Sequence, residues 1–122
     1  MHFIFLLVIL VSTQITAQTV DATKLSTQSE VNFIQTEKRG IQTKKGDIFW
    51  VHSDLKTVLC VDADKNIRWK VNIIEKCGKP MVGAAEIRHI QLTKKGLGIT
   101  YGKHNYAVLD AKTGNVIYFG SD

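Results

Sequence analysis

The sequence lacks the short motifs that mark common catalytic and cofactor sites. No HExxH, GxSxG, phosphate-binding loop or dinucleotide-binding glycine pattern occurs in its 122 residues. Three histidines, His52, His89 and His104, have no His or Cys partner at the spacing of a zinc site. We therefore predict no catalytic, cofactor-binding or metal-binding residues, and we expect that the protein is not an enzyme.

Long apolar runs are also missing. The unbroken run at residues 3–11 is too short for a membrane span, which needs about 20 residues. It belongs to a stretch, 1–17, that has no charged side chain and ends in the small residues Thr16 and Ala17. This pattern predicts a signal peptide cleaved near Ala17, so that the mature protein is secreted or periplasmic. A buried first strand or helix and an uncleaved anchor are the alternatives.

Helical periodicity is nearly absent, and alternation of apolar and polar residues takes its place. The fold class predicted from this is all-β. Residues 18–35, which are rich in Thr, Ser and Gln, are expected to form a flexible leader, and residues 36–122 a single all-β domain. Pro80, the only proline, marks the connection between two halves. The predicted strands are DIFWV, TVLCVD, IRWKVNII, RHIQL, GIT, YAVLD and NVIYF.

The two halves are related in sequence, as copies at about 40–75 and 88–122. The period of about 50 residues is typical of propeller blades and similar arrays. Each copy predicts a hairpin whose turn needs a residue with positive φ, for which Gly114 serves in the second copy and Asn66 in the first. The matching stretches are IQTKKG (41–46) with IQLTKKG (90–96), and TVLCVDADKNIRW (57–69) with NYAVLDAKTGNVIY (105–118), so that Asp62 aligns with Asp110 and Trp69 with Tyr118.

The stretch VLDAKTGNVIY resembles the repeat of the pyrroloquinoline-quinone-type (PQQ-like) β-propellers. The resemblance implies four-stranded antiparallel blades, and propellers close with four to eight of them. Two copies suggest a small two-sheet sandwich or a partial propeller that assembles with further copies. The quinone is not expected here, because the vicinal Cys-Cys pair that stacks on it in the family's alcohol dehydrogenases is absent. Family members without the cofactor serve as periplasmic scaffolds and binding modules.

The two cysteines allow two interpretations. Cys60 and Cys77 are an even pair in an exported chain, which makes them a candidate disulfide. In a hairpin of the first copy, however, Cys60 faces the region of Trp69, and Cys77 lies about eight residues further along. Cys60 also aligns with Val108, as a buried small apolar residue would.

Exposed turns supply the candidate binding surface. The mature chain carries a formal charge of +5, and pairs of lysines precede glycines in equivalent turns. Such turns form either a cationic rim for an anionic partner or solvated hairpin tips. We expect a binding or scaffold module for a protein or an anionic cell-surface component, with no nucleic acid and with homo-oligomerisation as an option; an inhibitor or immunity-type protein is the alternative. The surface residues are His52, Asp54, Lys56, Lys103, His104, Asn105, Lys44, Lys45, Lys94 and Lys95.

Overall fold

The computed structural model describes residues 20–122. The predicted signal peptide, 1–17, lies outside the described residues. Within them, no helix has the length and apolar character needed to cross a membrane.

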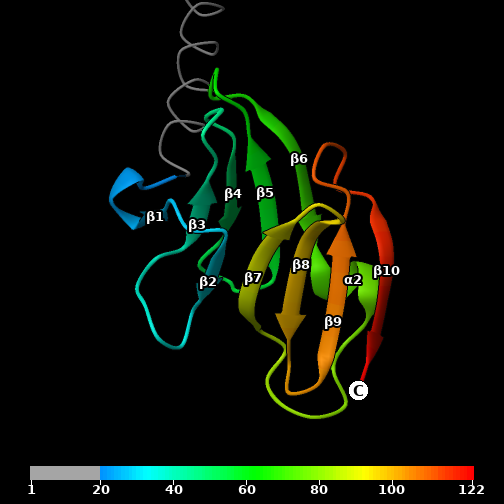
Figure 1. The fold of residues 1–122 in the computed structure, drawn as a ribbon. Helices are drawn as coiled ribbons and strands as arrows, with labels where there is room; N and C mark the ends of the chain where they lie inside the picture. Colours follow the sequence, from blue (N-terminus) through cyan, green and yellow to red (C-terminus); the bar gives the residue numbers. More distant parts are fainter. Residues whose placement is uncertain (1–19) are drawn as a thin grey trace, which may run out of the picture.

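The fold is all-β, as the alternation predicts, with two five-stranded sheets packed as a small sandwich (Figure 1). The first sheet has the order β1-β3-β4-β5-β6, and the second β10-β9-β8-β7-β2. Each sequence repeat forms a four-stranded antiparallel meander, β3 to β6 or β7 to β10. The strands are β1 Leu25–Ser26, β2 Glu30–Asn32, β3 Gly40–Gln42, β4 Ile48–Val51, β5 Thr57–Val61, β6 Ile67–Asn72, β7 Ile87–Thr93, β8 Gly96–Tyr101, β9 Asn105–Leu109 and β10 Val116–Ser121.

The fifth strand of each sheet comes from the segment expected to be a flexible leader. Between residues 20 and 35 the structure has the 3-10 helix η1 (Ala22–Lys24), then β1, which pairs with β3 in parallel, and β2, which pairs with β7. Val31, at the centre of β2, is buried opposite Ile90 in the core. A three-residue strand needs only one inward apolar side chain, so the polar composition around Val31 conceals it. The folded domain therefore begins before residue 36.

The main core lies between the sheets and contains the inward side chains of both meanders. A second, smaller cluster lies on the outer face of the first sheet, where Trp50, Leu59 and Val61 contact Leu25 and Val20 of the N-terminal segment. Because β5 is covered on both faces, all five of its residues are buried. The apolar run TVLCV reflects this double coverage.

The aligned aromatic residues of the two repeats face opposite sides of their sheets. Trp69 pairs with Cys60 and points into the core, with 7% of its surface exposed. Tyr118 pairs with Val108 and is 46% exposed, with its ring 6.2 Å from that of Tyr106 on the outer face. The alignment of the two repeats therefore predicts where the turns lie, but not which face of its sheet an aligned side chain occupies.

The third hairpin turn of each repeat has an equivalent backbone hydrogen bond. The Asp62 amide donates to the Asn66 carbonyl, and the Asp110 amide donates to the Asn115 carbonyl. Positive φ falls at Gly114 (76°), as predicted, but in the first copy it falls at Lys65 (68°) and not at Asn66. Asn66 is held in place because its amide donates to the Asp62 carboxylate, which leaves the preceding residue to take the left-handed conformation.

One short helix, α2 (Ile73–Cys77), follows β6. Asn72 caps it, because its side-chain oxygen accepts hydrogen bonds from the amides of Ile74 and Glu75. Cys77 ends α2 against the core, whereas Cys60 lies within β5. Both thiols are free, so the candidate disulfide is not formed.

Candidate functional site

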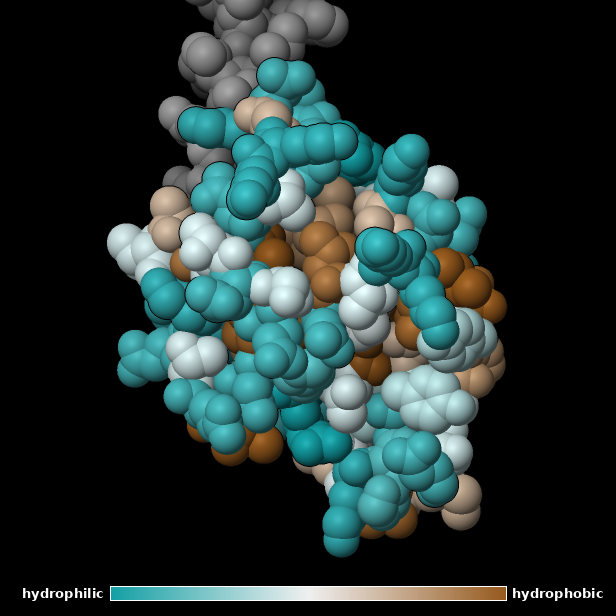
Figure 2. All heavy atoms as spheres, viewed as in Figure 1, coloured by the Kyte–Doolittle hydropathy of each residue, from teal (hydrophilic) through white to brown (hydrophobic). Residues whose placement is uncertain are grey.

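The hairpin turns place both predicted lysine pairs at one end of the sandwich. In each meander, the first and third turns lie at the same end, because successive strands are antiparallel. The TKKG turns are the first turns, and the DADKN and DAKTGN turns are the third. The ends of the two sheets meet around a hollow of about 400 Å³, to which both sheets contribute. In Figure 2 a hollow with a hydrophobic floor opens above the centre, with hydrophilic side chains on either side.

We call this hollow the basic mouth. Its floor is apolar and consists of Phe49 from β4, Leu92 from β7 and Ala111 from the turn after β9. Its rim is mostly cationic and consists of Thr43, Lys44, Lys45, Asp47, Arg68 and Lys112.

Trp69 fixes the floor. Its ring lies 6.1 Å from that of Phe49, and its indole N–H donates a hydrogen bond of 2.9 Å to the Ala111 carbonyl of the other sheet. Gly114 gives the indole room, since a Cβ at this position would lie 2.6 Å from the ring. The turn of one repeat is thus attached to the core of the other. The floor is held from both sheets.

The rim carries more cationic than anionic side chains. Asp47 lies 3.6 Å from Arg68, which is a partly exposed ion pair of small energetic value. The nearby Asp110 carboxylate accepts hydrogen bonds from the amides of Lys112 and Thr113, which hold the pKa of Asp110 below its ordinary value. Asp110 is therefore engaged with its own turn. Lys44, Lys45 and Lys112 have no carboxylate within ion-pair distance in the described part of the chain.

Cys60 lies under this end of the first sheet. Burial raises the pKa of its thiol to about 11, against the nearby charge of Arg68, which lowers the pKa, while Asp47 and Asp62 add to the rise. The thiol is therefore protonated at neutral pH and behaves as an apolar core group.

The structure separates the remaining predicted residues into groups. Lys94 and Lys95 lie in the β7–β8 turn, directly after Thr93, at the same end as the mouth but outside its lining. The loops that contain His52, Asp54, Lys56, Lys103, His104 and Asn105 lie at the opposite end of the meanders.

In the described part of the chain, the two loops at that opposite end line separate hollows. His52 lines a hollow with Arg39, whose guanidinium donates a 2.8 Å hydrogen bond to the His52 carbonyl. Lys103 lines another hollow, where Arg88 donates to the Lys103 carbonyl. Asp54 caps its own loop, because its carboxylate accepts from two amides and from the Thr57 hydroxyl.

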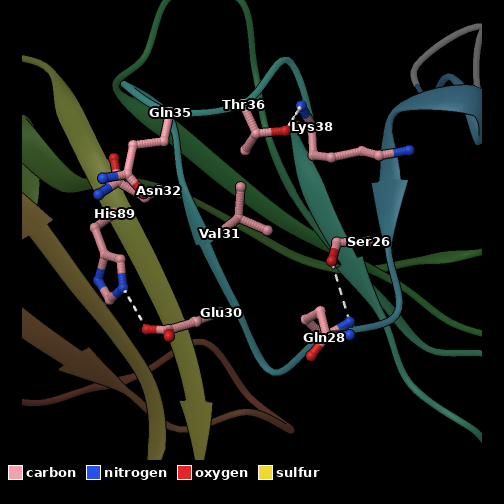
Figure 3. Close-up of a pocket in the computed structure, with 9 residues that line it drawn as sticks. All are labelled: Ser26, Gln28, Glu30, Val31, Asn32, Gln35, Thr36, Lys38 and His89. Carbon is pink, nitrogen blue, oxygen red and sulfur yellow. Dashed lines mark hydrogen bonds and ion pairs between the residues drawn. The ribbon is translucent and has the colours of Figure 1, made fainter.

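A polar groove of about 460 Å³, which no sequence pattern predicted, lies where the N-terminal segment crosses from one sheet to the other. His89 and Glu30 point toward each other across the pairing of β7 and β2, with Nε2 2.9 Å from Oε2 (Figure 3). Lys38 points away toward β1 (Figure 3) and donates to the Thr23 carbonyl. These polar groups bind the segment to the domain, so we place the candidate site at the mouth.

Sequence reasoning missed the floor of the mouth and two of its cations, Arg68 and Lys112. Leu92 and Ala111 lie within or beside the repeated turn motifs, which was the only available signal. Among the described residues, no group of three or more His, Cys, Asp or Glu side chains could hold a metal ion. The chain matches no family model, no curated protein and no solved structure, so the PQQ-like repeat stays a resemblance.

Proposed function

We propose that the protein is an exported binding module, without catalysis of its own, that holds an acidic segment of a protein partner at the basic mouth. The observation that carries this proposal is the combination of an apolar floor with a cationic rim. An acidic segment with one apolar side chain would satisfy both parts of the site. A bare polyanion would use only the rim.

The rigidity of the site supports binding. Phe49 is buried in the core, and Ala111 is tied to Trp69 across the sheets. A preformed floor costs little ordering free energy when a partner binds. The acids Asp54 and Asp110 are engaged as turn caps, and the Cys60 thiol is buried and protonated, so these groups support a structural role.

The test uses a fluorescein-labelled acidic peptide with one central phenylalanine, followed by fluorescence anisotropy. We expect saturable binding that the double variant Lys45→Gln/Lys112→Gln weakens by about tenfold, because close charge pairs at an interface are lost. The matched control, Lys56→Gln/Lys103→Gln, makes the same charge change at the opposite end of the meanders and should have little effect.

A second peptide, with serine in place of phenylalanine, tests the floor. It should bind less tightly by about tenfold, since burial of an aromatic side chain is lost. Heparin is a polyanion without an apolar side chain for the floor, so it should compete poorly with the phenylalanine peptide. This holds at physiological salt, where interactions between exposed charges are screened beyond about 8 Å. Equal effects of the two double variants, or equal binding of the two peptides, would contradict the proposal.

The loop after α2 supports the alternative function of an inhibitor or immunity-type protein. Met81 is 99% exposed, and the loop is held beneath it because the Lys103 amide donates to the Val82 carbonyl and Pro80 lies against Gly102. A fixed loop with an exposed apolar tip is suited to insertion into a partner's pocket. If a purified partner loses affinity with Met81→Asp and not with the mouth variant, the inhibitor interpretation replaces the first.

A further inference from the structure

The four sheet edges differ in how they are protected. An exposed edge carries unpaired N–H and C=O groups, and proteins shield such edges with short strands or with charged side chains. In this fold β1 has two residues and β2 has three, while β6 carries Arg68 and Lys70. The fourth edge, β10, has six residues, VIYFGS, and no charge.

The β10 edge is also apolar on both faces. Ile117, Tyr118 and Phe119 are each about half exposed. Phe119 pairs with the buried Ala107 and so projects to the inner side, whereas Tyr118 contacts Tyr106 on the outer side. Within the described residues β10 pairs only with β9, which leaves its second row of backbone groups without a strand.

We propose that β10 pairs antiparallel with β10 of a second copy of this chain, joining the two second sheets into one continuous sheet. Strand addition satisfies the free backbone groups and covers apolar side chains from both copies. A two-fold axis near the middle of the strand brings Tyr118 and Phe119 alongside their counterparts.

The charges of the chain favour a second copy in this orientation. A chain of net charge +5 repels its own copy where basic surfaces meet. β10 has no charged side chain, so it does not repel β10 of a second copy. The β9–β10 turn, with Lys112, lies at the start of the strand. Antiparallel pairing therefore sends the two basic mouths to opposite ends of the joined sheet, whereas parallel pairing sets them side by side.

Sedimentation equilibrium of the full chain over a range of concentrations tests the proposal. We expect a reversible dimer with a dissociation constant on the order of micromolar, because one added strand makes a small interface. Phe119→Lys should raise that constant by about tenfold or more, since it places a charge at the middle of the edge. Tyr118→Lys provides a second variant on the other face.

Ile67→Lys is the matched control, because Ile67 is similarly exposed (45% against 54% for Phe119) but lies on the β6 edge. It should leave the dimer unchanged. Hydrogen exchange on the unmodified chain provides a readout without substitution, and β10 amides should exchange more slowly as concentration rises. A monomer up to about millimolar concentration, or equal effects of Phe119→Lys and Ile67→Lys, overturns the proposal.

Discussion

At the scale of single residues, the indole of Trp69 lies where the two sheets meet below the mouth. It contacts Phe49 of its own sheet, and it donates to the Ala111 carbonyl of the other sheet. The ring also lies directly against the backbone of Gly114. Position 114 therefore requires a residue that adopts a positive φ and has no Cβ.

The equivalent turns of the two repeats make this testable. Gly114→Ala should lower the free energy of unfolding by about 2 kcal/mol or more, because it adds backbone strain and a clash with the indole. Lys65→Gly, at the matching position, should change it by less than about 1 kcal/mol, because relief of strain is offset by glycine's greater freedom in the unfolded chain. Urea titration measures both. A loss at Gly114→Ala no larger than the change at Lys65→Gly would show that the ring does not need the space.

Asp110 gives a pH dependence at the same turn. Hydrogen bonds from the amides of Lys112 and Thr113 lower its pKa in the folded state below the ordinary 3.8. A lowered carboxyl pKa contributes stability that is present above the unfolded pKa and is lost as pH falls through the folded pKa. As pH falls below about 4, Asp110→Asn should therefore lose less of its stability than the unmodified chain does.

Asp64→Asn is the control for this titration, because the Asp64 carboxylate accepts no hydrogen bond in the described part of the chain. It should retain the acid dependence of the unmodified protein. Urea titrations across this pH range compare the three proteins. Parallel curves for all of them would remove Asp110 from the account of acid stability.

At the scale of elements, the N-terminal segment completes both sheets. β1 extends the first sheet beside β3, and β2 crosses to extend the second beside β7. The segment also covers Trp50 and Leu59 on the outer face of the first sheet. Without β2, the edge of β7 would be open in the same way as that of β10.

A pair of substitutions measures what β2 contributes. Val31 is 2% exposed and packs in the core, whereas Ile34, three residues later, is 73% exposed. Val31→Ala should lower the free energy of unfolding by about 2 kcal/mol, through lost burial and the cavity that remains. Ile34→Ala should change it by no more than about 0.5 kcal/mol. If the two variants are equally stable, β2 is not part of the cooperative core.

At the scale of the whole molecule, local patterns predicted the meanders and long-range geometry decided the rest. Apolar and polar residues alternate along the strands, and the TKKG and Asp-Ala turns recur at fixed offsets, so most strands and turns of the meanders could be predicted from the chain. The predicted strand IRWKVNII was too long, because β6 ends at Asn72 and α2 begins at Ile73. β2 could not be predicted, since one apolar residue gives no periodicity. Nor could the opposite faces of Trp69 and Tyr118, because the faces depend on strand register.

The candidate site divides in the same way. Lys44 and Lys45 were predicted because the TKKG motif recurs, and they line the mouth. Phe49, Leu92 and Ala111 become a floor only when the ends of two sheets meet, a contact between residues far apart in sequence. His52 follows β4 and His104 follows β8, which are equivalent places in the two repeats, but in the described part of the chain the hollow lined by His52 does not include His104.

The proposed function requires that a partner binds between the turn ends of the two sheets. Its most direct test is an amide chemical-shift titration of the isotope-labelled protein with the acidic phenylalanine peptide. We expect that shifts concentrate at residues 43–49, 92–95 and 110–113, and that they saturate together. Shifts concentrated in the loops at 52–56 and 102–105, or along the polar groove at 26–38, would contradict it.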